Sequence, residues 1–362
     1  MPLPYDLAPH VITEDLNILA CASCGHMQSA QPNGSTQKAI YETYYSHYQV
    51  DSAEALLPHY RQPFKQFLDK HLSKQPGVRD NRSILEIGCS SGVNIDFFTE
   101  FAARYVGIDA SERIKLAQAS HPDHEFVAGY FPETMPDGKF DIIVSQFNLE
   151  HIGDIGSFLS ACRSKATPDG QLILQVPDID DFERSGQPNF LAHEHLQYFR
   201  KNQLAIALRR NGWSPFAWDT LGASLICGCQ CSTSIPDLSG NSEGRRQLPQ
   251  SFATRFNSTP EIPDRPLILY GVGPLLFWIM QHVKPEQTRH VLDDNPAYAG
   301  LFVPGTTWPV EVLSASMLRE TPDIVLSLNS MYHDRVLARI RAFGISASIT
   351  RCKDSVWETF TI

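Results

Sequence analysis

The sequence lacks both a long apolar run and a basic tract. No stretch reaches the roughly 18 apolar residues that suggest a membrane span, and the longest candidate, residues 274–280, has the length of a core helix. Lysine and arginine number 30 against 40 aspartates and glutamates, which gives a net charge of −10. We therefore expect neither nucleic acid nor a membrane as a partner. A small anionic ligand remains compatible with this charge, because a local cationic pocket or a helix terminus can bind it.

Targeting signals, repeats and a disulfide framework are also missing. Residues 1–10 (MPLPYDLAPH) contain neither a basic nor an apolar segment, so no signal peptide is predicted. We find no repeat of solenoid length. Eight cysteines in 362 residues, several of them in apolar strand-like patterns, indicate reduced thiols. Together these features predict a cytoplasmic protein.

Three blocks are visible along the chain, whose length suits two or three domains. Residues 1–60 form a small module with one Cys-x-x-Cys pair and a tyrosine-rich segment. Residues 61–235 alternate strand and helix patterns. Residues 236–362 begin with a polar stretch and then repeat that alternation on a smaller scale. The alternation predicts an α/β fold with parallel sheets covered on both faces.

The predicted elements are short apolar runs and amphipathic segments. The second block has five predicted strands, at 82–88, 105–110, 124–130, 139–147 and 170–178. Residues 93–105 (VNIDFFTEFAARY) are predicted to form a helix after the first strand. The third block has predicted strands at 266–273, 290–296, 323–330 and 346–352, with a helix over 331–343. This block is predicted to be a second, smaller Rossmann-like unit.

The most specific local signal is LEIGCSSG at residues 85–92, between a strand and a helix. Gly88 and Gly92 allow a sharp turn and a close approach of a ligand to the backbone. Backbone N–H groups then face that ligand from the helix terminus. Asp109 ends the next strand, where an acidic side chain can accept the hydroxyl hydrogens of a ribose. The pattern predicts a nucleoside-binding domain.

The spacing E-x-G-x-x-x-G differs from the G-x-G-x-x-G of dinucleotide folds. An acidic residue beside the loop repels a pyrophosphate but suits the cationic methionine portion of S-adenosylmethionine. Residues 139–152 resemble the fourth-strand motif of such a domain, and residues 167–178 resemble its following turn and fifth strand, in the same order along the chain. Residues 61–235 therefore resemble a class I S-adenosylmethionine-dependent methyltransferase, with a Rossmann-like sheet.

The resemblance implies a set of cofactor-binding residues. They are Glu86, Gly88, Cys89, Ser90, Gly92, Asp109, Ala110, Tyr130, Phe131, Gln146 and Phe147. Where such domains often have an acid for the adenine amino group, this chain has AGYF at 128–131. Backbone groups with Tyr130 or Phe131 are then the candidates to hold adenine.

Nearly the whole chain resembles the nucleotide-sugar C-methyltransferases. These enzymes methylate a deoxysugar carbon next to a ketone while the sugar is attached to a nucleotide. The matching features are a Cys-x-x-Cys-Gly start, FLAHEHLQYF at 190–199, LGASL at 221–225, and YGVG with DDNP in the third block. The resemblance implies His195 as general base and Glu194 as its partner. Ala192 stands where the family tends to have tyrosine.

A carbon acceptor requires removal of a proton next to a carbonyl and stabilisation of the enolate. Histidine, with an ordinary pKa of about 6.5, is suited to this task. His151 is a candidate for a second acid or base. Two other interpretations of His193 and His195 stay open: a polar turn, and a metal site, for which no third ligand has a recognisable spacing.

Tyr45, Tyr48, His193 and Tyr198 are candidate substrate-binding residues. The tyrosines of the first block could equally pack that segment onto the sheet. Cys21 and Cys24 supply two of the four ligands that structural zinc requires, and His10 or His26 could complete such a site. Zinc is therefore a cofactor to test rather than one that we expect. Cys227, Cys229 and Cys231 are better explained as a strand.

In the third block Gly271, Gly273, Asp293 and Asp294 imitate a dinucleotide site without its third glycine. A second redox cofactor, a nucleotide-anchoring surface and a purely structural unit are the competing interpretations, and the resemblance favours the second. The expected activity is methylation of a nucleotide-linked keto-deoxysugar by a monomer or homodimer. An O- or N-methyltransferase on a related metabolite, or a scaffold protein that binds S-adenosylmethionine without turnover, are the alternatives.

Overall fold

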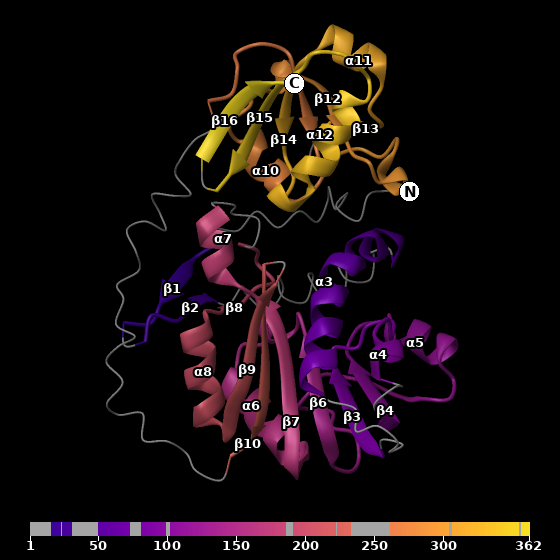
Figure 1. The fold of residues 1–362 in the computed structure, drawn as a ribbon, viewed down its shortest axis with the longest axis vertical. Coiled ribbons are helices and arrows are strands. Elements are labelled where there is room, and N and C mark those ends of the chain that lie inside the picture. Colours follow the sequence, from indigo (N-terminus) through magenta and orange to yellow (C-terminus); the bar gives the residue numbers. More distant parts are fainter. Residues whose placement is uncertain are drawn as a thin grey trace.

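The computed structural model describes residues 16–22, 24–30, 50–72, 81–98, 102–185, 191–221, 223–232, 261–303, 306–354 and 356–362. These residues form a three-stranded, a seven-stranded and a six-stranded sheet (Figure 1). Helices accompany the two larger sheets, so the predicted α/β class with two Rossmann-like sheets is confirmed.

The seven-stranded sheet has the order β5-β4-β3-β6-β7-β10-β9. Its strands are β3 (Arg82–Ile87), β4 (Ala102–Asp109), β5 (Glu125–Ala128), β6 (Phe140–Gln146), β7 (Ala166–Pro177), β9 (Trp213–Leu221) and β10 (Ser224–Cys231). The first five are parallel, as predicted. β10 runs antiparallel to both β7 and β9. Because β10 contains Cys227, Cys229 and Cys231, the prediction of a strand there is confirmed.

Both faces of this sheet are covered by helices. Leu85 and Ile87 of β3 belong to one buried cluster, whereas Ile84 belongs to the other. This alternation is the period of two that a strand imposes. The helices that pack on the sheet are α3 (Val50–His71), α4 (Ile95–Phe98), α5 (Ile114–Ser120), α6 (Ile155–Lys165) and α8 (Lys201–Arg210), whereas α7 (Ile179–Ser185) packs through Ile179 against Met27 and Tyr198 of the three-stranded sheet. The carboxyl ends of the parallel strands therefore meet at one edge, where ligands bind in such sheets.

The predicted helix over residues 93–105 is wrong from Ala102 onward. α4 is described over Ile95–Phe98, residues 99–101 lie outside the described residues, and β4 begins at Ala102. The backbone there pairs with β3 in parallel, Ala102 opposite Arg82 and Tyr105 opposite Ile84. Pairing with a central strand therefore overrides the helical spacing of the apolar residues.

A small sheet connects the first block with the HEHLQYF segment. β1 (Ile18–Ala20) and β2 (Met27–Ser29) form a hairpin, and β2 pairs with β8 (Gln197–Tyr198). The boundary predicted after residue 60 lies within α3, whose Phe64 and Phe67 are buried against the seven-stranded sheet. The hairpin and α3 thus reach the second block at separate places.

The six-stranded sheet has the order β13-β12-β11-β14-β15-β16. Its elements are β11 (Leu267–Tyr270), α10 (Pro274–Met280), η5 (Pro285–Gln287), β12 (Thr288–Leu292), η6 (Pro296–Tyr298), β13 (Val310–Glu311), α11 (Ala315–Glu320), β14 (Asp323–Leu326), η7 (Ser330–Tyr332), α12 (His333–Arg341), β15 (Ser348–Lys353) and β16 (Val356–Thr361). The four predicted strands are present, and β13 and β16 join them at the edges. In the described ranges, no helix is both long and apolar enough to span a bilayer.

Candidate active site

The glycine loop follows β3 and has the conformation that its glycines permit. Gly88 has φ 80° and Gly92 has φ 76°, both in the left-handed region. A Cβ atom on Gly88 would lie 3.2 Å from the Cβ of Asn148. The loop therefore packs directly against the segment that follows β6, and its two glycines serve backbone geometry as well as ligand approach.

Asp109 fixes this loop to the end of β4. Its Oδ2 accepts a 2.7 Å hydrogen bond from the backbone N–H of Ser90, and its Oδ1 accepts bonds from the backbone N–H and hydroxyl of Ser111. Ser90 itself has φ 50°, which is unusual for a residue with a side chain. The carboxylate thus shapes the loop, and it lies where a ribose is expected to bind.

Glu86 lies beneath the loop and is 1% exposed. Its carboxyl group accepts hydrogen bonds from the Tyr105 hydroxyl at 2.5 Å and from Asn94 Nδ2 at 3.2 Å. Burial raises the pKa of Glu86 to about 7, and these two bonds oppose the shift. The carboxyl group therefore has its hydrogen-bond partners within the protein. It lies buried behind the backbone of the glycine loop.

Two features mark the carboxyl end of β6. Gln146 Nε2 is buried and has no hydrogen-bond partner among the residues that the structure describes. Phe147 has φ 45° and donates its backbone N–H to Gln175 O at 2.8 Å. Buried donors are nearly always paired, and strained backbone gathers at binding sites. Both observations fit a ligand at this point.

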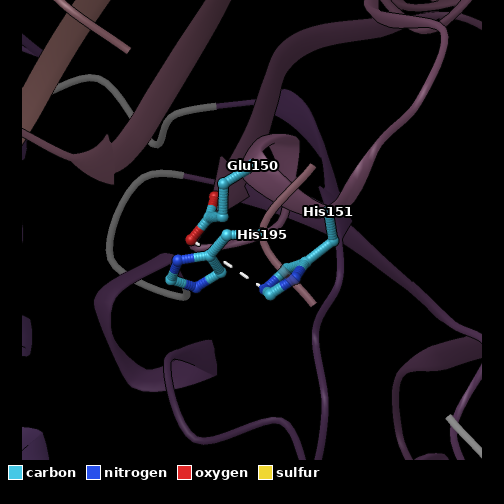
Figure 2. Close-up of side chains that lie close together, drawn as sticks. All are labelled: Glu150, His151 and His195. Atoms are coloured by element: carbon cyan, nitrogen blue, oxygen red, sulfur yellow. Dashed lines mark ion pairs between the residues drawn. The ribbon is translucent and has the colours of Figure 1, made fainter. Parts of the chain in front are cut away.

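Directly after β6, the short helix η2 (Leu149–His151) carries Glu150 and His151. His195 comes from the segment before β8. One nitrogen or oxygen atom from each of these three side chains lies within 4.8 Å of the others. The ring centroids of His151 and His195 are 5.1 Å apart. Figure 2 shows the carboxyl group of Glu150 and the two rings around one common space.

The His151 ring is oriented by the HEHLQYF segment. Its Nδ1 lies 2.8 Å from the backbone carbonyl oxygen of Glu194. A carbonyl only accepts, so Nδ1 carries the proton and Nε2 presents its lone pair. That nitrogen lies 4.0 Å from Glu150 Oε1. Burial, with a smaller contribution from His195, lowers the pKa of His151 to about 3, so the ring is neutral.

Two acids lie in this region. Glu150 is 2% exposed, and its Oε2 has no hydrogen-bond partner within the described ranges. Burial raises the pKa of Glu150 to about 8, and the charge of Glu194 adds to the shift. Burial also raises the pKa of Glu194, to about 7. The structure therefore brings predicted His151, Glu194 and His195 together, and it adds Glu150, which sequence reasoning missed.

The remaining predicted cofactor residues differ in their surroundings. Tyr130 is 56% exposed, whereas Phe131 is 7% exposed and packs edge-on against Phe158 with ring centroids 5.5 Å apart. Tyr130 is thus the ring that a ligand can reach. Cys89 is buried, which raises the pKa of its thiol. Ala110 follows Asp109 at the exposed end of β4.

The predicted substrate residues are only partly described. His193 is half-buried in the turn that follows Ala192, whereas Tyr198 is buried and its hydroxyl lies 3.4 Å from the Ala192 carbonyl oxygen. Tyr198 thus supports the turn from below. Tyr45 and Tyr48 lie outside the described residues.

The predicted zinc ligands occupy the turn of the first hairpin. Cys21 is exposed and Cys24 half-buried, and both thiols are unoxidised. His26 Nε2 is 2.7 Å from Gln197 Oε1, so this nitrogen already has a protein partner. His10 lies outside the described residues. Zinc at this pair, which the sequence did not lead us to expect, stays untested.

The third block repeats one feature of the glycine loop. Asp293 Oδ2 accepts a 2.7 Å bond from the backbone N–H of Val272, much as Asp109 does from Ser90. Gly271 has φ 114°, and a Cβ there would lie 2.6 Å from Leu328. Gly273 has extended backbone with φ −170°. Packing therefore accounts for Gly271, and a nucleotide surface here stays a prediction.

Comparison with known proteins shows what the second block is similar to. Residues 57–216 match the family model of the methyltransferase domain. A ubiquinone biosynthesis O-methyltransferase of Rhodopseudomonas palustris (strain TIE-1) is 33% identical over 110 residues, which cover 29% of this chain and 42% of that protein. C-methyltransferase NovU of Streptomyces niveus is 23% identical over 141 residues, which cover 38% of this chain and 34% of that protein. This chain thus spans less than half the length of these curated relatives.

A solved structure with a similar fold is the 1,6-didemethyltoxoflavin-N1-methyltransferase of Burkholderia thailandensis, with bound 1,6-didemethyltoxoflavin and S-adenosylhomocysteine. It is 16% identical, and the match covers 57% of this chain and 96% of that chain with a TM-score of 0.44. Residues 57–216, which contain the five parallel strands of the seven-stranded sheet, are thus similar to a methyltransferase domain.

Proposed function

We propose that this chain transfers the methyl group of S-adenosylmethionine to the carbon next to the ketone of a nucleotide-linked keto-deoxysugar. The observation that carries this proposal is the position of His195, which lies with His151 and Glu150 directly beyond β6. The glycine loop packs on Asn148 in the same segment. A proton acceptor therefore adjoins the candidate cofactor site.

The described residues fit the cofactor. The left-handed glycines Gly88 and Gly92 put no Cβ in the way of a ligand, and Gln146 offers a buried donor that has no partner in the described part of the chain. In this proposal Asp109 accepts hydrogen bonds from the ribose hydroxyl groups, and Tyr130 covers adenine. S-Adenosylmethionine supplies an electrophilic methyl group, so most of the acceleration comes from positioning the acceptor in line.

His195 takes the proton of the acceptor carbon in this proposal. Carbon acidity next to a ketone is weak, so the base must lie close and the developing enolate must be stabilised. His151, held neutral and oriented by the Glu194 carbonyl, is positioned to accept a hydrogen bond beside it through Nε2. The relation to C-methyltransferase NovU supports a carbon acceptor.

A second candidate is methylation of a hydroxyl group, supported by the similarity to an O-methyltransferase over 110 residues. It would require His195 only as a base for an oxygen nucleophile. Both candidates use the same cofactor and the same donor side of the site, so they differ in the acceptor atom alone.

The test is a mass-spectrometric screen of nucleotide sugars with the chain and S-adenosylmethionine labelled in its methyl group. The expected product is a 4-keto sugar nucleotide with one added methyl group. It is about 14 mass units heavier than the substrate, before the mass of the isotope label is added. Exchange of the hydrogen next to the ketone in heavy water would assign the carbon. Labelled product without exchange, with the methyl on oxygen, would replace the proposal by its rival, and cofactor binding without any product would indicate a scaffold.

A further inference from the structure

We infer that Glu150, His151 and His195 form a binding site for a divalent first-row transition-metal ion. Two imidazoles and one carboxylate are a donor set that binds such ions with positions left open for other ligands. The three side chains each place one donor atom within 4.8 Å of the other two. This inference goes beyond the proposed function, because it concerns binding of an ion and not methyl transfer.

The separations suit an ion with little rearrangement. Metal–nitrogen and metal–oxygen bonds are about 2.1 Å long, so two ligands of one ion lie at most about 4.2 Å apart. His151 Nε2 and Glu150 Oε1 are already 4.0 Å apart. Even a separation of 4.8 Å, the upper bound for these three atoms, closes with a shift of a few tenths of an ångström at each side chain.

The second observation is the unsatisfied carboxyl group. Glu150 is 2% exposed, and its Oε2 has no hydrogen-bond partner in the part of the chain that the structure describes. A buried oxygen without a partner is destabilising, and a bound cation would remove that cost. Figure 2 shows this carboxyl group turned toward the two rings rather than toward the backbone around it.

The third observation is the orientation of His151. Histidines that bind metals usually donate their other ring N–H to a carbonyl or carboxylate, which fixes the tautomer. His151 Nδ1 makes this contact with the carbonyl of Glu194 at 2.8 Å. The lone pair of Nε2, on the side of Glu150, is then available to a metal ion. The surroundings of His151 are thus already those of a metal ligand.

The two segments that carry the ligands are joined by backbone hydrogen bonds. Leu196 N–H donates to Glu150 O at 2.7 Å, and Gln197 Nε2 donates to the carbonyls of Ile152 and Gly153. The ligands therefore come from one rigid unit, as a preformed site requires. Since a ring nitrogen bound to a cation cannot take a proton, an ion here and the proton of the acceptor compete for His195.

The test measures binding of Mn²⁺ alone, by calorimetry and by the electron paramagnetic resonance signal of free Mn²⁺. Mn²⁺ prefers oxygen and nitrogen ligands, so the thiols of Cys21 and Cys24 do not compete. We expect one saturable site, weakened at least about tenfold in Glu150→Gln and in His151→Asn. Glu311→Gln is the matched control, because Glu311 also pairs with a histidine, His290, at 2.7 Å.

Glu150→Gln keeps the shape of a neutral carboxyl group, so it removes the charge with little change in packing. Thermal unfolding establishes that each variant is folded. Equal Mn²⁺ affinity in the wild type, Glu150→Gln and His151→Asn would overturn the inference, as would the absence of saturable binding. Equal weakening by Glu311→Gln would also overturn it, because the ion would then bind acidic surface in general. None of these outcomes depends on turnover, so a failure of the proposed function remains distinguishable.

Discussion

His151 Nδ1 lies 2.8 Å from the backbone carbonyl oxygen of Glu194, although the two residues are 43 positions apart in the sequence. This contact joins the segment after β6 to the HEHLQYF segment and fixes which nitrogen of His151 faces the site. Through this contact the motif with His151 and the motif with His195 belong to one site. The chemistry of either motif therefore depends on the other.

Replacement of His195 by asparagine is expected to lower turnover by at least about a hundredfold, the usual contribution of a positioned base. The affinity for S-adenosylmethionine should change by less than about threefold, because the ring belongs to the acceptor side. Single-turnover rates with labelled cofactor and calorimetric binding measure the two effects. His290→Asn, in the six-stranded sheet, is the control, and near-normal turnover of the His195 variant would refute its role as base.

Replacement of Gly88 by alanine tests the glycine loop. The left-handed φ of 80° costs alanine about 1–2 kcal/mol, and its Cβ would meet Asn148 at 3.2 Å. Gly300→Ala is the matched control, because Gly300 has φ 79° and no atom within 4 Å of an added Cβ. Both variants should unfold at lower temperature. Only Gly88→Ala should weaken S-adenosylmethionine binding, by about tenfold or more, and equal affinities would place the cofactor elsewhere.

Asp109→Asn is expected to weaken S-adenosylmethionine binding by about ten- to a hundredfold. Its amide group can replace only part of the bonds that the carboxylate accepts from Ser90 and Ser111, and it removes the acceptor for ribose. Asp293→Asn is the control, since Asp293 accepts the equivalent bond from Val272 at 2.7 Å. Calorimetric titration compares the two. A loss caused by Asp293→Asn instead would assign the cofactor to the six-stranded sheet.

Glu86→Gln tests the buried acid beneath the loop. The pKa of Glu86 is about 7 in the folded protein against an ordinary 4.5, so folding favours the protonated form. Its contribution to stability is fully present below pH 4.5 and is lost as the pH rises to about 7. The loss amounts to about 3 kcal/mol.

Glutamine lacks this titration, its oxygen can still accept from Asn94 Nδ2, and its NH2 group can donate to the Tyr105 hydroxyl oxygen in place of the bond that Glu86 accepts. The difference in free energy of unfolding between Glu86→Gln and the wild type should therefore grow in favour of the variant between pH 4.5 and 7. Urea unfolding at a series of pH values measures it, with Glu112→Gln, at an exposed acid, as the control for lost charge. Parallel pH profiles of variant and wild type would contradict the raised pKa.

Much of the fold could be predicted because its strands are buried on both faces. The centre of the predicted strand at residues 139–147, residues 142–144, is apolar and buried without interruption, and glycine loops separate such runs at fixed places. The helix over 93–105 was mispredicted because pairing with β3 decides the conformation from Ala102 onward. β16 was missed because its residues are mostly exposed and show no apolar period.

The candidate site was predictable only in part. Local patterns identify the glycine loop and both histidine motifs, because spacing within a segment of ten residues records backbone geometry. Glu150 carries no such signal, since its role comes from His195, a neighbour across the fold. The sequence contains the pair Glu150 and His151 directly after a buried strand, and that position was the available clue.

The hairpin of β1 and β2 holds the HEHLQYF segment from a part of the chain that precedes the matched methyltransferase stretch. β2 is the described strand partner of β8, and Ser29 N–H donates to Leu196 O one residue after His195. The stretch that matches the methyltransferase family, residues 57–216, contains the segment but not the hairpin that holds it. A fragment cut to that match would keep every proposed catalytic side chain and still lose the frame that aligns them.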